Sequence, residues 1–438
     1  MLFYGEKPCL KLGRSLPSVE MTIFWIKTTN KISVSSALSA VKNNLLNLGP
    51  TMFNIKTINN ISEKGLSRLP ADSYSISPDK ENPDAIILRS ANIHEMEVPS
   101  NLKVIGRAGA GTNNVPVHKL GEQGIVVFNA PGANANAVKE LVIAGMLLAC
   151  RNICQAWQYA ANVKGTDEEQ NKAVEAGKKT YVGYELPGRT LGVIGLGAIG
   201  VEIANAAVAL GMRVVGFDPR ITVKSAWKMS ADVEEMENVD ELLKEADFVT
   251  FHVPLIDATK DLLNAGRIAT MKDGAVILNF ARHGIVNDTD VLAAIDSGKL
   301  HAYVCDFPCQ KLKNHDRVIT LPHLGASTAE AEENCAIMVA DQIKDFLENG
   351  NIKNSVNYPD VKLPRGGKSR VAVTHMNMPD MIAKISSAVG DAGYNIYHLR
   401  NESKGDLAYT LMDIESEIGE DLIAELAKIE GVLKARQV

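Results

Sequence analysis

Short apolar runs separated by polar turns and helical segments make up the chain from about residue 52 onward. Runs of about four to eight apolar residues bounded by glycine, proline or asparagine are typical of buried strands. Such strands alternating with helices predict parallel sheets with right-handed crossovers, and therefore an α/β fold. The strands predicted for the first sheet are residues 54–57, 85–89, 104–108 and 125–129.

A second sheet is predicted after one long helix over residues 136–163, which is expected to bridge two domains. The capping box Ser327-Thr-Ala-Glu330 predicts the start of a further helix that ends at Gly350. We expect that helix to return the chain to the first domain, which would make the first domain discontinuous. The strands predicted for the second sheet are residues 191–194, 213–217, 248–253, 275–279 and 302–306.

The C-terminal part of the chain has a different pattern. Residues 354–368 contain two prolines, two glycines and few apolar positions, which is typical of a linker. Residues 369–438 then follow the order β-α-β-β-α-β, which predicts a ferredoxin-like unit. We expect such a unit to bind a small molecule or to pair with a copy of itself.

A glycine-rich turn joins the first strand of the second sheet to its helix, in Gly195-x-Gly197-x-x-Gly200. The first glycine of this spacing suits a tight turn, and the second lets a pyrophosphate approach the backbone. The third lets the helix pack closely on the strand. With a strand before it and a helix behind it, the turn predicts a dinucleotide site.

The residues after this turn indicate which dinucleotide is bound. The helix beginning at Ala198 and Ile199 offers free N–H groups and a positive dipole end to phosphates. The next strand ends at Asp218, 18 residues beyond Gly200. A carboxylate there accepts hydrogen bonds from ribose hydroxyls and repels a 2′-phosphate. The pattern therefore predicts NAD as the cofactor.

Composition narrows the class of protein further. The 438 residues are 46% hydrophobic and 22% charged, as in an ordinary globular protein of about three domains. A net charge of −6 gives no general attraction to nucleic acid or to an anionic membrane. The longest apolar stretch, residues 141–150, is too short to span a bilayer. We expect a cytoplasmic protein without a metal site.

Residues 1–51 are basic, contain several serines and lack clear periodicity. They are interpreted as a disordered N-terminal extension or the product of an upstream start. The alternative is an organelle-targeting peptide, which is typically basic and poor in acidic residues. That alternative would make the protein organellar.

Two arginines follow strands of the first predicted sheet. Arg89 ends one strand, and Arg107 ends another just before Ala108 and Gly109. Ligands of open α/β sheets bind at the carboxyl ends of the strands, and backbone N–H groups after Arg107 can bind an anion. The two arginines are candidate anion ligands; arginines on solvated loops are the alternative.

Three residues of the second sheet are candidates for catalysis. Arg282 follows a buried strand, where its guanidinium can bind a carboxylate through two hydrogen bonds. Asp306 ends the next strand, and His323 lies where the chain returns to the first domain. Oxidation of an alcohol with NAD needs a base for the hydroxyl proton, which suits histidine. Arginine and histidine together downstream of an NAD motif predict a dehydrogenase.

In these motifs and their order, the sequence resembles the D-3-phosphoglycerate dehydrogenases of the D-2-hydroxyacid dehydrogenase superfamily. Its tail resembles an ACT domain, and the resemblance covers residues 52–438. It implies oxidation of 3-phosphoglycerate to 3-phosphohydroxypyruvate, the first step of serine biosynthesis. It also implies a homodimer or homotetramer.

The resemblance also implies roles for individual residues. Arg282 would bind and polarise the substrate carboxylate, and His323 would be the acid and base. The substrate phosphate or carboxylate would be held by Arg89, Arg107, Ala108 and Gly109. The remaining contacts of NAD would come from Pro254 near the adenine and Asp306 near the nicotinamide. L-serine, as an effector, would bind His375, Asn377 and Asn395.

The sequence departs from the family pattern at three positions. A carboxylate usually follows the Asp306-Phe-Pro turn and pairs with the catalytic histidine, whereas this chain has Gln310 there. His283 follows Arg282 where glycine is usual, and Asp380 replaces a glycine in the serine motif. Gln310 is therefore the expected but unusual partner of His323.

Two alternative functions remain open at this point. A broader 2-hydroxyacid or glyoxylate/hydroxypyruvate reductase would share the NAD motif and the catalytic pair. A non-catalytic NAD sensor of the corepressor type would share the fold, but Arg282 and His323 favour an enzyme.

The predicted architecture is a Rossmann-type doubly wound NAD domain inserted in a discontinuous flavodoxin-like substrate domain, followed by a ferredoxin-like (ACT) α+β domain. Its parts are the extension 1–51, the substrate domain 52–130 with 326–353, the NAD domain 131–325, the linker 354–368 and the ACT domain 369–438.

Overall fold

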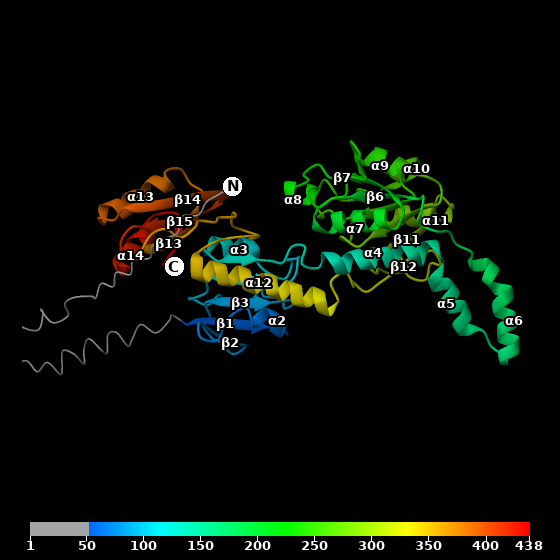
Figure 1. The fold of residues 1–438 in the computed structure, drawn as a ribbon, viewed down its shortest axis with the longest axis horizontal. Coiled ribbons are helices and arrows are strands. Elements are labelled where there is room, and N and C mark those ends of the chain that lie inside the picture. Colours follow the sequence, from blue (N-terminus) through cyan, green and yellow to red (C-terminus); the bar gives the residue numbers. More distant parts are fainter. Residues whose placement is uncertain (1–51) are drawn as a thin grey trace, which may run out of the picture. The chain divides into compact units, whose positions relative to one another are not determined.

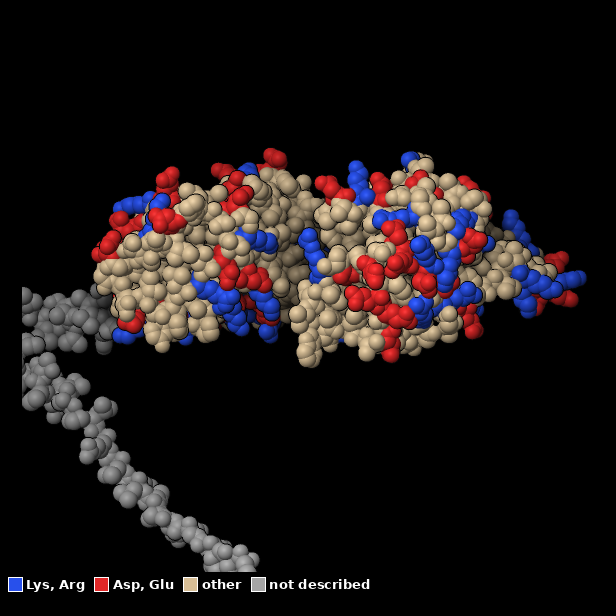
Figure 2. All heavy atoms as spheres, turned by 90° about the horizontal axis from the view of Figure 1, so that it is seen from above, with Lys and Arg blue, Asp and Glu red and all other residues tan. Residues whose placement is uncertain are grey.

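A computed structural model describes residues 52–438 (Figure 1). The interpretations of the N-terminal extension, as disordered or as a targeting peptide, concern residues 1–51 and lie outside the described residues. Within the described part, no helix is long and apolar enough to cross a membrane. Basic and acidic side chains are intermingled on the face in Figure 2, in keeping with the modest net charge of −6.

The first sheet has five parallel strands in the order β2-β1-β3-β4-β5. All four predicted strands are present, and the half-buried edge strand β2 was not predicted from its polar sequence Tyr-Ser-Ile-Ser. The elements are β1 (Phe53–Ile58), α2 (Glu63–Leu66), β2 (Tyr74–Ser77), β3 (Ala85–Leu88), β4 (Val104–Arg107), α3 (Val117–Glu122) and β5 (Val126–Phe128).

The second sheet has seven parallel strands in the order β12-β11-β10-β9-β6-β7-β8. Its strand order reverses beside β6, and ligands of open α/β sheets bind at such a switch point. The strands are β6 (Thr190–Ile194), β7 (Arg213–Phe217), β8 (Val233–Glu235), β9 (Phe248–Phe251), β10 (Ala275–Asn279), β11 (Leu300–Cys305) and β12 (Val318–Thr320). The helices are α7 (Ala198–Ala209), α8 (Val223–Ala226), α9 (Val239–Glu245), α10 (Ala265–Thr270) and α11 (Asp288–Asp296).

The prediction of one long helix over residues 136–163 is wrong. The structure has α4 (Ala135–Cys150) and α5 (Ile153–Asn162), separated at Asn152, whose φ of 52° is left-handed. Asparagine adopts this conformation more readily than most residues, so it ends α4 and redirects the chain. The chain then forms α6 (Asp167–Gly177), which follows α5 in Figure 1, and the short η1 (Lys178–Tyr181). No residue of α5, α6 or η1 is buried.

Helix α12 (Ala329–Asn349) follows the second sheet but packs on the first, where Val339, Ile343 and Phe346 share a core with β1 and β5. It ends at Gly350, as predicted, with a left-handed φ of 70°. The predicted capping box is wrong, because the capping residue is Thr328. Its Oγ1 accepts a hydrogen bond from the backbone N–H of Ala331 over 3.1 Å.

The C-terminal unit has the predicted β-α-β-β-α-β order, with an antiparallel sheet in the order β14-β15-β13-β16. One face of this sheet packs on its own two helices. On the other face, Ala372, Tyr409 and Leu411 join the core of the first sheet and α12. The elements are β13 (Ser369–Met376), α13 (Met381–Asp391), β14 (Ile396–Lys404), β15 (Leu407–Ile414), α14 (Glu420–Lys428) and β16 (Val432–Gln437).

Of residues 354–368, predicted as a linker, the first part (354–361) is mostly buried, while most of residues 362–368 are exposed. The Tyr358 side chain is fully buried, and its hydroxyl donates to the Gly121 carbonyl over 2.7 Å. The Ser355 hydroxyl donates to the Val127 carbonyl of β5 over 3.1 Å. The segment therefore fixes the C-terminal unit to the first sheet.

Candidate active site

The three glycines after β6 have the separate roles that their spacing predicts. A Cβ at Gly195 would lie 2.7 Å from the His252 carbonyl oxygen, and one at Gly200 would overlap the Gly195 carbonyl. A Cβ at Gly197 would meet nothing within 4 Å. Gly195 and Gly200 thus allow close packing, while the backbone at Gly197 faces open space where a pyrophosphate fits.

The surroundings of this turn also fit a dinucleotide. Gly197 precedes α7 without a side-chain cap, so the first N–H groups of the helix, from Ala198 and Ile199, are available to phosphate. The Asp218 carboxylate accepts hydrogen bonds from the backbone N–H groups of Leu196 and Arg220, each over 2.8 Å. Asp218 therefore holds the glycine turn in place at the end of β7, where a ribose would lie.

A second group of predicted residues lines one cavity of about 790 Å³. Residues from the first sheet and residues from the second sheet meet in it. The predicted residues in its wall are Arg89, Arg107, Ala108, Gly109, Arg282 and His323.

The three arginines of this cavity are close enough to affect one another. Burial, and then the positive charges of Arg89 and Arg282, lower the pKa of Arg107, while the nearby Cys335 thiol opposes the shift. The Nε of Arg107 is buried and has no partner among the described residues. Glu332 pairs with Arg89 and is the one carboxylate among the described lining residues, so the charges of Arg107 and Arg282 favour an anionic ligand.

Gly109 leaves room for the Arg107 guanidinium, and Gly111 lies beside that of Arg282. A Cβ at Gly109 would overlap the guanidinium of Arg107. A Cβ at Gly111 would lie 3.5 Å from Nη2 of Arg282, whose Nη1 donates to the Ala281 carbonyl over 2.7 Å. Arg282 thus extends from the second sheet to the glycine loop after β4.

His323 is fixed by backbone contacts with Asp306 at the end of β11. Its N–H donates to the Asp306 carbonyl over 3.1 Å, and its φ is left-handed at 45°. The N–H of Gly325 donates to Oδ2 of Asp306 over 3.4 Å, and the Phe307 ring lies edge-on to the imidazole. Burial raises the pKa of Asp306, and the nearby His323 opposes that shift.

Comparisons with known proteins agree with this geometry. Residues 143–325 match the family model for the NAD binding domain of D-isomer specific 2-hydroxyacid dehydrogenases. The chain is 34% identical over 357 residues to D-3-phosphoglycerate dehydrogenase of Haemophilus influenzae, covering 78% of this chain and 82% of that protein. The chain belongs to the D-3-phosphoglycerate dehydrogenases of the D-2-hydroxyacid dehydrogenase family.

Other members of this family match as well. Hydroxypyruvate reductase of Thermotoga maritima is 39% identical over 61% of this chain and 85% of its own length. D-3-phosphoglycerate dehydrogenase of Methanocaldococcus jannaschii is 38% identical over 71% of this chain, but the match spans only 58% of that relative. The NAD+-bound 3-phosphoglycerate dehydrogenase structure from Entamoeba histolytica has a TM-score of 0.55 at 26% identity, covering 70% of this chain and 99% of that one. The cofactor of this dehydrogenase is NAD.

The structure does not bring Gln310 to the catalytic histidine. Gln310 is exposed in the turn after β11, and no hydrogen bond joins it to His323 within residues 52–438. The acidic side chain beside His323 is Asp306, which is 1% exposed. The Asp306 carboxylate acts on His323 through its charge alone: among the described residues no hydrogen bond joins the two side chains, and Oδ1 of Asp306 has no partner.

Of the other predicted NAD contacts, Pro254 is exposed in the loop after β9. Its carbonyl accepts a hydrogen bond from the Thr259 hydroxyl over 2.5 Å. This bond braces the loop on the same side of the sheet as the glycine turn, because both follow the carboxyl ends of neighbouring strands.

The three residues expected to bind serine are not brought together within one chain. His375 pairs with Ala408 near one end of β13, while Ile396, next to Asn395, pairs with Ile414 at the other end of the sheet. Six residues of strand separate the two ends, or roughly 20 Å. The His375 ring is 1% exposed and contacts the Met376 carbonyl, Asn401 and Thr410.

Asn134 and Glu332 are among the residues of the cavity that were not predicted from the sequence. Asn134 precedes α4 at 9% exposure, and its Oδ1 is buried without a partner among the described residues. It is the residue before the first turn of α4, but its side chain makes no capping bond. Glu332 lies in the first turn of α12 and pairs with Arg89.

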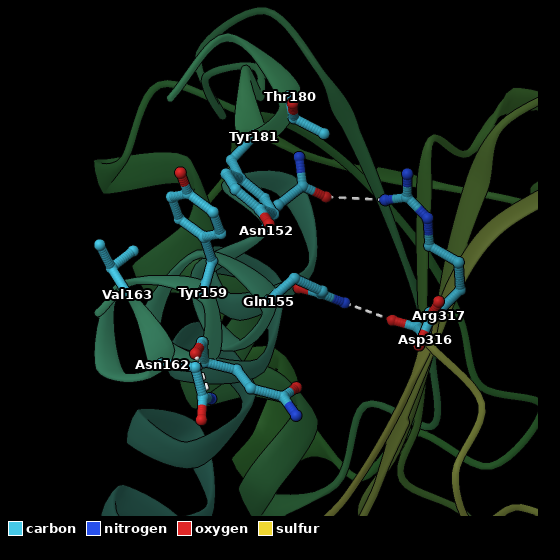
Figure 3. A pocket seen from close by; sticks show the side chains of 10 residues that line it. Asn152, Gln155, Tyr159, Asn162, Val163, Thr180, Tyr181, Asp316 and Arg317 are labelled. Carbon is cyan, nitrogen blue, oxygen red and sulfur yellow. Dashed lines mark hydrogen bonds between the residues drawn. The ribbon is translucent and has the colours of Figure 1, made fainter. Parts of the chain in front are cut away.

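A separate cavity of about 550 Å³ lies between α5, η1 and the loop before β12 (Figure 3). Arg317 Nη1 donates to Asn152 Oδ1 over 2.7 Å, and Gln155 donates to the Asp316 carbonyl. None of the predicted site residues lines this cavity. It is a feature of the protruding helices rather than of the active site.

Proposed function

We propose that this dehydrogenase oxidises 3-phosphoglycerate to 3-phosphohydroxypyruvate with NAD, the first step of serine biosynthesis. The observation that carries this proposal is the meeting of Arg89, Arg107 and Arg282 with His323 at one cavity. The substrate has a carboxylate at one end and a phosphate at the other. Three guanidinium groups match such a doubly anionic molecule, because arginine binds both groups through paired hydrogen bonds.

Each side chain has a step in this reaction. Bound NAD supplies the hydride acceptor. The imidazole of His323 takes the proton of the substrate hydroxyl during oxidation and returns it during reduction. Arg282 binds the carboxylate and orients the reacting carbon. The Asp306 carboxylate, fixed by the N–H of Gly325, stabilises the imidazolium that forms.

The phosphate end would lie against the first sheet. Arg89 and Arg107 follow neighbouring strands β3 and β4, so their side chains meet at the same edge. The backbone N–H groups of the loop at Ala108 and Gly109 add uncharged donors beside them. This arrangement supports a phosphorylated substrate over a small unphosphorylated one.

The second candidate is reduction of hydroxypyruvate or glyoxylate, which the likeness to the Thermotoga maritima hydroxypyruvate reductase favours. The third is the non-catalytic NAD sensor. NADH oxidation measured with phosphohydroxypyruvate, hydroxypyruvate and glyoxylate separates all three. We expect kcat/KM to be highest for phosphohydroxypyruvate. Equal or faster turnover of the unphosphorylated acids would reject the proposal, and no turnover of any would favour the sensor.

We also propose that the protein works as a homodimer or homotetramer. Helices α5 and α6 bury none of their residues, and Trp157 on α5 is 72% exposed. A second copy would cover such apolar side chains. Sedimentation of the wild type and of Trp157→Glu tests this: a dimer that dissociates in the variant supports it, and a wild-type monomer rejects it.

L-serine is proposed as an effector that binds between two C-terminal units. Strand β14 is an open edge of its sheet, and a second copy there could place its Asn395 near His375 and Asn377 of the first. Asn377 donates to the Gly405 carbonyl at this end of the sheet. Calorimetry should show serine binding that Asn395→Ala abolishes. Absence of binding at millimolar serine would reject the proposal.

A further inference from the structure

The Arg89 side chain is paired with an acidic residue of the active-site cavity. Its Nη2 lies 2.7 Å from Oε1 of Glu332, and the two side chains are 35% and 42% exposed. Arg89 follows β3, and Glu332 lies in the first turn of α12. Among the described residues that line this cavity, Glu332 is the one with a carboxylate.

A phosphate bound by Arg89, as in the proposed function, would contact the same guanidinium that Glu332 contacts here. A phosphate and a carboxylate that contact one guanidinium repel each other, so each binds less favourably when the other is present. The pair is also easily opened, because water solvates both exposed partners and such pairs add little net stability. A bound phosphate would therefore displace Glu332 toward solvent.

We propose that the Glu332 carboxylate competes with phosphate for the Arg89 guanidinium. This competition weakens the binding of every phosphate-bearing ligand by the same factor. This inference rests on the proposed function. The substrate still binds despite this loss of affinity at its phosphate, because its carboxylate also binds Arg282. Inorganic phosphate has no such second contact, so the same factor keeps it from occupying the cavity.

The neighbouring residue provides a matched control. Glu333 pairs with Lys64 over 2.6 Å and does not line the cavity. Glu332→Gln removes one negative charge and keeps an oxygen that can still accept from Arg89. Glu333→Gln makes the same change one residue away, so it reports any general effect of charge on α12.

The test measures the affinity of the full chain for inorganic phosphate by calorimetry, and the KM values for phosphohydroxypyruvate and hydroxypyruvate. In Glu332→Gln, we expect the phosphate Kd and the phosphohydroxypyruvate KM to fall by one common factor, roughly fivefold. The KM for hydroxypyruvate should change less, because that substrate lacks the phosphate. Glu333→Gln should alter none of the three.

Two results would overturn the inference. An unchanged or weaker phosphate affinity in Glu332→Gln would show that the carboxylate does not compete for Arg89. An equal change in the KM values of both keto acids would show that Glu332 acts on the whole site. The proposed function fails by a different result, namely no preference of the wild type for phosphohydroxypyruvate over hydroxypyruvate.

Discussion

His323 and Asp306 are joined through the backbone, with the N–H of His323 donating to the Asp306 carbonyl over 3.1 Å. The left-handed φ of His323, 45°, turns the chain back over the end of β11. The catalytic histidine is thereby anchored to the residue whose carboxylate lies beside it. The conformation is uncommon for a residue other than glycine, and such residues often occur at active sites.

The first prediction concerns the charge beside His323. Asp306→Asn removes a carboxylate that stabilises the protonated imidazole. Keto-acid reduction needs that protonated form, so its rate should decline at a lower pH than in the wild type. Gln310→Glu should leave the profile in place, because Gln310 is exposed and makes no bond to His323. The pH dependence of NADH oxidation shows whether Asp306 or Gln310 influences His323. A pH profile that shifts in Gln310→Glu but not in Asp306→Asn would contradict the structure.

Gly109→Ala should disrupt the anion site. The added Cβ overlaps the Arg107 guanidinium, which must move away from the cavity. We expect KM for phosphohydroxypyruvate to rise roughly tenfold or more, as when a charge-assisted hydrogen bond is lost. Gly390→Ala is the control, since a Cβ there meets nothing within 4 Å on α13. Steady-state kinetics of both variants test this, and equal KM values would contradict it.

Asp218→Arg should shift the cofactor preference toward NADP. The variant replaces an acceptor of ribose hydroxyls with a donor suited to a 2′-phosphate. It also removes the acceptor for the N–H of Leu196, so NAD binding should weaken. The ratio of kcat/KM for the two cofactors is the measurement. An unchanged ratio would mean that Asp218 does not face the ribose.

Arg370→Met should loosen the C-terminal unit. Arg370 donates to Asp413 over 2.6 Å and 2.9 Å, and its Nη1 donates to the carbonyls of Asn349 and Leu363. Both side chains of the pair are at most 1% exposed, so the variant leaves a buried carboxylate without its cation. We expect a loss of about 3–5 kcal/mol in the free energy of unfolding. Arg68→Met, which breaks an exposed pair, should cost about 0–1 kcal/mol.

The same ion pair has a pH dependence with a definite sign. Burial raises the pKa of Asp413, but the hydrogen bonds from Arg370 and from the N–H of Gly366 outweigh it and hold the pKa below its usual value. A lowered pKa gives stability above the unfolded value of about 4, and that stability is lost as the pH falls through the folded value. Urea denaturation at pH 7 and pH 3 should therefore show a smaller difference between wild type and Arg370→Met at pH 3. A difference that grows at pH 3 would contradict this assignment.

The parts that could be predicted from the sequence depend on local patterns. The spacing of Gly195, Gly197 and Gly200 fixes a turn whatever surrounds it, and strand ends locate Arg89 and Arg107. The break at Asn152 could not be predicted, because the apolar pattern continues through it. The exposure of Gln310, which the family pattern pairs with His323, depends on how the turn after β11 folds.

The docking of the C-terminal unit was also missed, although the sequence contains a signal for it. Strand β13 is buried along almost its whole length, and its central run Val371-Ala-Val373 has no polar position. A strand that is covered on both faces has a continuous run of apolar residues. In a strand with one solvated face, apolar and polar residues alternate. The run therefore points to a second partner for the sheet, and that partner is α12 with the first sheet.

The most direct test of the central claim compares two substrates in one variant. If Arg107 helps to bind the phosphate, Arg107→Gln should lower the ratio of kcat/KM for phosphohydroxypyruvate to that for hydroxypyruvate. We expect a fall of roughly ten- to a hundredfold, as for the loss of a hydrogen bond to a charged group. An unchanged ratio in a folded Arg107→Gln variant would contradict the assignment of this cavity to a phosphorylated substrate.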